Sequence, residues 1–301
     1  MKRITVIIDT LPWAFGSHYK DLRRQFPQFA WQYAVNSGNA KHIPEGSTDA
    51  VYSLACWWAI DTVPPERCLL SVRSTRQYDK SFYSRYPGGL AQFLRDNYGR
   101  VTGLSETICN ELHPFWPKVE HLPNGIDTER FQPAPGQGRN GKLVVGWAGW
   151  TQGRTRGWKR LEMIEQAVAE TDHCELRVAE YNTPTYVPWE LVHEWYQGLD
   201  VYVCASSGGE GSNRSTLEAM ACGVPVISAV VGEAAFLVRD GDTGMRFDGT
   251  LEDLKAKIAQ MQDDKARRDM GHRARQLIEG ERSWRRVRPR YEQIFEELLS
   301  E

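Results

Sequence analysis

Short apolar runs alternate with amphipathic helical patterns along the whole of this 301-residue chain. Apolar strands flanked by such helices predict a parallel sheet that is covered by helices on both faces. We expect strands at residues 4–8, 50–55, 68–72 and 100–104, and again at 143–147, 175–179, 201–204 and 224–228. The accompanying helices are expected at 19–26, 89–98 and 106–112, and at 159–170, 190–198, 214–221 and 233–238. Two such sets predict an α/β fold with two Rossmann-like domains, in which ligands bind at the carboxyl ends of the strands.

A stretch of turn-forming residues divides the two sets. Residues 123–127 read Pro-Asn-Gly-Ile-Asp, and proline and glycine recur between 133 and 141. Residues of these types mark a connection rather than the interior of a helix or strand. A chain of this length is long enough for two domains that each have a core. We therefore place a domain boundary near residue 122.

The composition is that of a soluble globular protein. Apolar residues make up 41% of the chain, charged residues 25%, and the net charge is −2, which implies no general attraction to nucleic acid. The six cysteines form no Cys-x-x-Cys pair, so we expect reduced thiols, no disulfide and no metal site. The first residues read as a strand instead of a signal peptide, and no apolar stretch is long enough to cross a bilayer. These features predict a cytoplasmic protein without a transmembrane segment, and they leave a peripheral membrane contact open.

Two glutamates lie eight positions apart at a predicted loop-to-helix boundary. Residues 210–218 read Glu-Gly-Ser-Asn-Arg-Ser-Thr-Leu-Glu, and Ala-Met-Ala-Cys-Gly-Val-Pro-Val-Ile follows directly. A carboxylate accepts protons from two hydroxyl groups at once, and the free amides of a helix start attract an anion. Glu210 and Glu218 would thus suit a ligand with sugar hydroxyls and a diphosphate. The alternative is that Glu210 is an ordinary loop residue and Glu218 an exposed helix residue.

This stretch resembles the E-x7-E signature of retaining GT-B glycosyltransferases of family 4. The resemblance extends to the turn-rich segment at 123–127 and to the C-terminal segment after Ser283-Trp284. It implies a GT-B fold, in which two Rossmann-like domains enclose a cleft and a C-terminal helix crosses back. The expected domains are residues 1–122 for the acceptor, residues 123–283 for the nucleotide sugar, and residues 284–301 for the returning helix.

The resemblance also implies roles for individual residues. Glu210 would hold the transferred sugar, and Glu218 would hold the ribose of the donor. Lys159 corresponds to the family's phosphate-binding lysine, and Arg154 or Arg156 stands in for its arginine, because Trp150 occupies the expected place. These cations would neutralise the leaving diphosphate. Further donor-binding residues are expected at the start of the helix and in the first strand-to-helix loop: Gly211, Ser212, Asn213, Arg214 and Gly16.

The acceptor site is less well defined by the sequence. The family has a histidine at the end of a first-domain strand, where this chain has Arg73 or Ser74. Residues 73–89 interleave arginines with aromatic residues, a pattern that suits sugars and phosphates. We expect acceptor contacts from this segment and from a nearby histidine, namely from Arg73, Arg76, Tyr78 and His18. An ordinary loop whose aromatic residues pack on the sheet is the alternative.

Together these features predict a retaining, metal-independent hexosyltransferase. Its donor would be a UDP- or GDP-linked sugar, and no further cofactor is expected. The acceptor would be a glycan, a lipid-linked molecule or a modified nucleic acid. Two alternatives remain open, namely a non-catalytic module that binds nucleotide sugars and a GT-B sugar-nucleotide epimerase.

Overall fold

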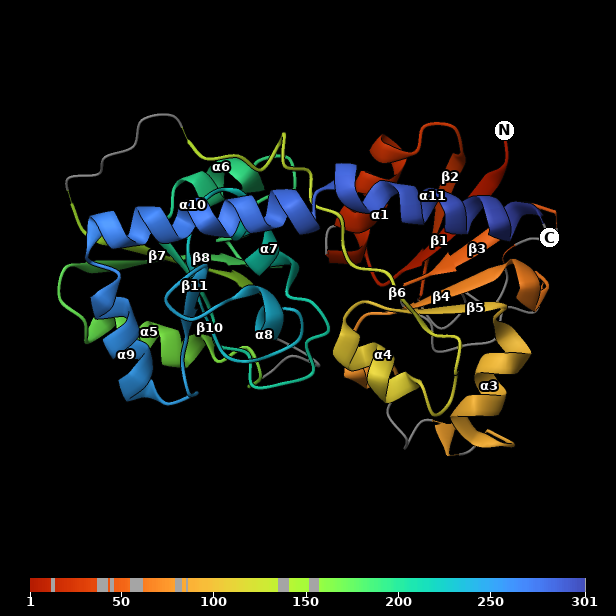
Figure 1. Ribbon diagram of the computed structural model, residues 1–301, viewed down its shortest axis with the longest axis horizontal. Helices are drawn as coiled ribbons and strands as arrows, with labels where there is room; N and C mark the ends of the chain where they lie inside the picture. Colours follow the sequence, from red (N-terminus) through yellow and green to blue (C-terminus); the bar gives the residue numbers. More distant parts are fainter. Residues whose placement is uncertain are drawn as a thin grey trace. The chain divides into compact units, whose positions relative to one another are not determined.

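The chain forms two compact units (Figure 1). The computed structural model describes all residues except 12–13, 37–42, 44–45, 55–61, 79–82, 85, 135–140, 152–156 and 301. Unit 1 consists of Met1–Asn124 and Val287–Glu301, and unit 2 consists of Gly125–Arg286. From the sequence we expected the chain to leave the first domain near residue 122 and to return to it after residue 283.

Unit 1 is built on a parallel sheet with the strand order β2-β1-β3-β4-β5-β6. In that order the strands are Ala30–Val35, Arg3–Ile8, Ala50–Ser53, Cys68–Val72, Arg100–Gly103 and Glu120–His121. The helices are α1 (Ala14–Gln25), α3 (Gly89–Asn97), α4 (Glu106–Leu112) and most of α11 (Trp284–Ser300). Strands β1, β3 and β4 are buried along nearly their whole length, as expected for the interior of a sheet with two covered faces.

Successive residues of β3 point to opposite faces of this sheet. Val51 belongs to the core beneath α3 and α4, whereas the ring of Tyr52 lies 5.6 Å from that of Phe295 on α11. In Figure 1, α1 and α11 lie on one side of the sheet, and α3 and α4 lie on the other. The C-terminal helix therefore supplies part of the core of the N-terminal unit.

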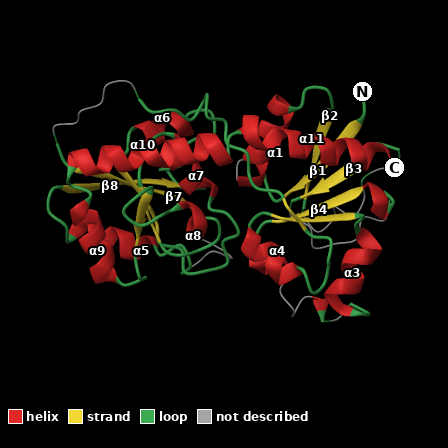
Figure 2. Cartoon of the chain, viewed as in Figure 1, coloured by secondary structure: helices red, strands yellow, loops and turns green. Residues whose placement is uncertain are grey.

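Unit 2 has a second parallel sheet, with the strand order β11-β10-β9-β7-β8. In that order the strands are Gly244–Arg246, Val226–Ser228, Val201–Cys204, Leu143–Gly149 and Cys174–Glu180. One face packs against α6 (Val192–Gln197), α7 (Arg214–Ala221) and α10 (Asp264–Glu281). The other face packs against α5 (Leu161–Ala169) and α9 (Leu251–Gln260), and α8 spans Ala234–Leu237. Figure 2 shows this layering of helices on the sheet.

The chain crosses between the units twice, and hydrogen bonds join neighbouring segments at the crossings. In unit 2, Ile126 N donates to Arg282 O at 2.8 Å, and Trp284 N donates to Ile126 O at 3.0 Å. A side chain at position 125 would begin 2.3 Å from the Trp284 ring, so only glycine fits there. In unit 1, the Tyr291 hydroxyl donates to Pro123 O at 3.0 Å. The outgoing and returning segments are thus fastened to one another within each unit.

The structure confirms the predicted α/β class and its parallel sheets, and it corrects several element boundaries. The helix expected from residue 159 begins at Leu161, because Arg160 has a left-handed backbone that no α-helix continues. The helix expected from residue 19 begins at Ala14, and the strand expected from 224 begins at Val226. Within the described residues, no helix combines the length and apolar character that a membrane crossing requires.

Candidate functional site

The candidate site lies at the carboxyl edge of the sheet in unit 2. The loop after β9 carries Glu210 and leads into α7, and the loop after β7 leads towards Lys159 and α5. Gly209 adopts a left-handed backbone, and a side chain there would begin 2.4 Å from the ring of Trp158. Ser207 N also donates to Trp158 O at 2.9 Å. These contacts fasten the glutamate loop to the lysine loop.

Glu210 and Lys159 form an ion pair within this edge. The Lys159 ammonium donates a hydrogen bond to Glu210 Oε1, and the Ser206 hydroxyl donates to the same oxygen at 2.9 Å. Each side chain of the ion pair is about 15% exposed. Burial acts to lower the pKa of Lys159, but the charge and hydrogen bond of Glu210, with Cys204 nearby, raise it above the ordinary lysine value. The lysine is therefore charged at neutral pH, and the pair stays in reach of a ligand.

The side chain of Asn213 caps the N-terminus of α7. Asn213 Oδ1 accepts from Thr216 N at 3.3 Å, and Asn213 Nδ2 donates to Cys204 Sγ at 3.0 Å. The backbone just before the cap is also held, since Glu233 N donates to Gly211 O at 3.1 Å. Gly211, Ser212, Asn213 and Arg214, whose amides the sequence assigned to the donor, lie at this helix start.

The second glutamate, Glu218, is buried one turn into α7, where it is 6% exposed. Arg214 Nε donates to Glu218 Oε1 at 2.7 Å, and the Tyr196 hydroxyl donates to Oε2 at 3.1 Å. Burial and the nearby Glu218 charge raise the pKa of Tyr196 far above its ordinary value, so Tyr196 is a neutral donor. Both glutamates thus have partners from their own chain, and neither is a simple exposed residue.

Several residues of this edge were not singled out by the sequence. Trp158, Ser206 and Tyr196 position the glutamates, yet a tryptophan, a serine and a tyrosine carry no motif of their own.

Aromatic residues also gather where β7 and β8 end. The ring centroids of Trp150 and Tyr181 are 6.1 Å apart, and those of Tyr181 and Tyr186 are 5.7 Å apart. The high tryptophan count was the only sequence signal for these residues.

Two of the four residues predicted to contact the acceptor, Arg73 and His18, are buried inside unit 1. Arg73 and His18 are 6% and 0% exposed, so the structure does not place them on an open groove. Arg73 donates to Asn124 Oδ1 at 2.7 Å and to the Tyr52 hydroxyl at 3.2 Å, and its Nη2 lies 3.0 Å from His18 Nε2. The guanidinium is therefore engaged by its own unit, and acceptor binding by this pair stays a prediction.

Of the remaining predicted site residues, the structure describes Gly16 in full and the others only in part or not at all. Gly16 lies in α1, where a side chain would begin 1.9 Å from Leu11 O, so the close backbone approach requires glycine. Arg76 and Tyr78 belong to a short 3₁₀ turn, and their side chains lie outside the described residues. Arg154 and Arg156 also lie outside the described residues.

Asp9 is a further residue of note, because it follows β1 at the carboxyl edge of unit 1. Burial raises the pKa of this carboxyl from 3.8 to about 6, although a 2.7 Å hydrogen bond from Thr10 N acts in the opposite direction. Such a shift marks a carboxyl that is held in a poorly solvated place.

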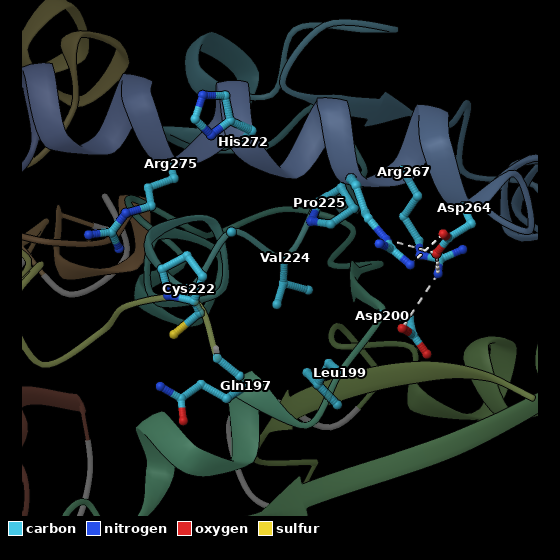
Figure 3. Close-up of a pocket in the computed structure, with 14 residues that line it drawn as sticks. Gln197, Leu199, Asp200, Cys222, Val224, Pro225, Asp264, Arg267, His272 and Arg275 are labelled. Carbon is cyan, nitrogen blue, oxygen red and sulfur yellow. Dashed lines mark hydrogen bonds and ion pairs between the residues drawn. The ribbon is translucent and has the colours of Figure 1, made fainter. Parts of the chain in front are cut away.

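A separate pocket of about 280 Å³ lies at the opposite, amino edge of the unit 2 sheet (Figure 3). Arg267 lies 2.7 Å from Asp264 and 3.6 Å from Asp200, and Arg268 lies 2.5 Å from Asp264. Arg275 donates to the carbonyls of neighbouring loops and lies 2.6 Å from Glu279. The arginines that line this pocket are matched by carboxylates and carbonyls of the chain itself, so their contacts stabilise the fold.

No group of three or more metal-ligating side chains occurs in the part of the chain that the structure describes.

Comparisons with known proteins agree with this architecture. Residues 165–277 match the family described as Glycosyl transferases group 1. The D-inositol 3-phosphate glycosyltransferase of Thermomonospora curvata is 33% identical over 128 residues, which are 42% of this chain and 28% of that protein. The lipopolysaccharide core biosynthesis mannosyltransferase LpsB of Rhizobium meliloti is 40% identical over 81 residues, which are 25% of this chain and 22% of that protein. The chain thus spans less than a third of the length of these curated relatives.

Solved structures resemble the whole chain. Sucrose-phosphate synthase from Thermosynechococcus elongatus superposes with a TM-score of 0.76 at 13% identity, covering 100% of both chains. Anabaena Alr3699/HepE in complex with UDP-glucose gives a TM-score of 0.74 at 15% identity, again over 100% of both chains. At such identities the likeness is one of fold. The chain therefore has the GT-B fold, and the segment that matches the glycosyl transferases group 1 family includes both Glu210 and Glu218.

Proposed function

We propose that this protein is a retaining glycosyltransferase that moves a hexose from a UDP- or GDP-linked sugar to a glycan, a lipid-linked molecule or a modified nucleic acid. One observation carries the proposal. The Lys159 cation and the Glu210 carboxylate meet at the carboxyl edge of the unit 2 sheet, where parallel α/β folds bind their ligands. A HepE structure that shares the fold holds UDP-glucose, and several curated relatives are named as glycosyl- or mannosyltransferases.

Each charged residue of this edge has a role in the proposal. The Lys159 ammonium neutralises the diphosphate as the bond between it and the sugar breaks. Glu210 accepts hydrogen bonds from sugar hydroxyls, and Glu218 accepts them from the ribose. Arg154 and Arg156 are the arginines proposed to assist Lys159, so that no divalent ion is required. Fixed side-chain charge then takes the part that a metal ion has in other transferases.

In the proposed reaction the acceptor oxygen bonds to the anomeric carbon on the face that the diphosphate leaves. The bond between that carbon and the diphosphate oxygen breaks at the same time. The acceptor proton passes to the departing phosphate oxygen, so no strong base from the protein is required. The sugar keeps its anomeric configuration as a result.

A two-stage experiment tests this function. Thermal shifts with UDP-glucose, UDP-N-acetylglucosamine and GDP-mannose would identify the donor, and NMR would then follow its slow hydrolysis. We expect one donor to stabilise the protein and its released sugar to appear first with the donor's anomeric configuration, also in the presence of EDTA. An inverted first product would contradict retention, loss of activity in EDTA would contradict metal independence, and binding without hydrolysis would favour the non-catalytic module.

A further inference from the structure

The two residues that the proposed function assigns to different parts of the donor are bonded to each other. Lys159 is meant for the diphosphate and Glu210 for the sugar, yet the ammonium donates directly to Glu210 Oε1. The Ser206 hydroxyl donates a second hydrogen bond to the same oxygen at 2.9 Å. The pair is only about 15% exposed, so screening by solvent weakens it less than it would a surface pair. A nucleotide-sugar donor therefore has to compete with this ion pair for the ammonium and for Glu210 Oε1.

The backbone on both sides of Lys159 is held in place. Before it, Trp158 O accepts from Ser207 N at 2.9 Å, and the Trp158 ring covers Gly209. After it, Arg160 adopts a left-handed backbone, and its Nη1 donates to Gly249 O at 2.9 Å. The lysine side chain between these anchors has four flexible carbons. Rotation of the Lys159 side chain can thus separate the pair while the backbone of Trp158 and Arg160 stays in place.

We propose that the Lys159–Glu210 ion pair is a latch that a nucleotide ligand must open, and that this latch discriminates between a sugar nucleotide and a bare nucleoside diphosphate. This inference rests on the proposed function. An incoming diphosphate draws the ammonium away from Glu210, and the freed carboxylate then bonds to hydroxyls of the sugar. The Ser206 hydroxyl keeps the carboxylate in place while the lysine moves. The energetic cost of separating the pair is recovered only by a ligand that has both parts.

The latch has a consequence for the end of the reaction. Once the sugar has left, Glu210 loses its hydroxyl partners while the nucleoside diphosphate still holds Lys159. Re-forming the ion pair then competes with the diphosphate for the ammonium and favours its release. The contact that an incoming ligand must open therefore also limits inhibition by the product.

Calorimetry with UDP and GDP, which lack the sugar, tests the latch. Glu210→Gln keeps the size of the side chain and its bond to Ser206 but removes the charge that holds Lys159. We expect this variant of the full chain to bind the preferred nucleoside diphosphate roughly three- to tenfold more tightly at low salt. The gain should shrink as salt is added, because screening weakens the pair in the wild type.

Two controls separate the latch from a general loss of negative charge. Glu180 ends β8 at the same edge and accepts from Thr151 N at 3.2 Å. Glu180→Gln makes the same charge change away from Lys159, and we expect it to alter the affinity by less than about twofold. In a Lys159→Met background, Glu210→Gln should give no gain, since no ammonium remains to be released.

The outcomes are distinguishable. Equal or weaker diphosphate binding by Glu210→Gln would overturn the latch and leave the proposed function intact. An equal gain in Glu180→Gln, or a gain that persists without Lys159, would also overturn it. Failure of both UDP and GDP to bind either the wild type or Glu210→Gln would overturn the proposed function and the latch together.

Discussion

The carboxyl edge of each sheet has a basic side chain, Arg73 in unit 1 and Lys159 in unit 2, and the two differ in exposure and in bonding partners. In unit 1, Arg73 and His18 are 6% and 0% exposed, and the guanidinium is bonded within its own unit. In unit 2, Lys159 and Glu210 keep about 15% exposure, and each has the other as its charged partner. A buried cation that is bonded to neutral groups stabilises one arrangement of the chain, whereas a reachable ion pair can exchange its partner for a ligand.

The difference teaches that a position at the carboxyl edge of a sheet does not by itself leave a charged side chain accessible to a ligand. Both edges lie where parallel α/β sheets bind ligands. In unit 1 that edge is joined to the inter-unit connection through Asn124 and to α11 through Tyr291, which donates to Pro123 O. In unit 2 the corresponding loops contain Gly209 and Gly232, both with left-handed backbones. Their lack of a side chain lets the glutamate loop approach Trp158 and the loop after β10 closely.

The largest expected effect is on catalysis by the unit 2 edge. Lys159→Ala should slow donor hydrolysis by about 100-fold, because it removes a cation from the leaving diphosphate. The midpoint of thermal unfolding should fall by less than about 3 °C, since the pair is partly exposed. Lys255→Ala, which removes a surface ion pair with Glu170, is the control and should leave both quantities unchanged. A large stability loss without a rate loss would mean that the ion pair has a structural role only.

The second effect is on the stability of unit 1. Arg73→Met should lower the free energy of unfolding by about 2 kcal/mol, because Asn124 and Tyr52 lose a buried donor. Urea unfolding of the full chain measures this change, and affinity for the nucleoside diphosphate should stay the same. Arg95→Met on the exposed face of α3 is the matched control. Unchanged stability together with altered acceptor use would assign the unit 1 edge to binding.

A third variant sharpens the division of labour within unit 2. Glu218→Ala should weaken binding of both the nucleoside diphosphate and the sugar nucleotide by about tenfold, since a charge-assisted contact to the ribose is lost. Isothermal calorimetry gives both affinities, with Glu162→Ala on the exposed start of α5 as the control. If only the sugar nucleotide were affected, the roles of the two glutamates would have to be exchanged.

The smallest effect concerns Asp9 and pH. Its pKa in the folded protein is about 6, above its ordinary 3.8, so the folded state binds the extra proton between these values. Stability therefore falls as pH rises from about 4 to about 6, and the loss persists above that range. Asp9→Asn should raise the free energy of unfolding at pH 7 by about 1 kcal/mol, after allowance for solvent screening. Identical pH profiles of unfolding for the variant and the wild type would contradict the assignment.

Much of the fold was predictable, because buried strands and clearly amphipathic helices carry strong patterns. The strands at 68–72 and 201–204 and the helices at 106–112 and 214–221 have the predicted bounds. The strand β2 was missed because it lies at the edge of its sheet and is only partly buried. Helix α10 was missed because only Met270, Gly271, Ala274 and Ile278 are buried, a narrow stripe that includes small residues.

The candidate site was predictable in its residues but not in its contacts. Lys159 and Glu210 were both identified, yet they are 51 residues apart and meet only because β7 and β9 are neighbours in the sheet. The burial of Arg73 likewise depends on Asn124 and His18, which lie 51 and 55 residues away in the sequence. Local sequence patterns identify candidate site residues, whereas the strand order of the sheet determines which of them contact each other.

The helix that returns to unit 1 sets the order in which the protein is completed during synthesis. The rings of Phe26, Trp31 and Tyr52 lie 5.4–5.6 Å from that of Phe295, so this aromatic cluster stays incomplete until Phe295 has been synthesised. Unit 2 ends at Arg286 and is fully synthesised first. At usual ribosome speeds the gap between Asn124 and Val287 takes roughly 10–30 s to translate. During that interval the aromatic side chains of the nascent N-terminal unit lack their partner Phe295.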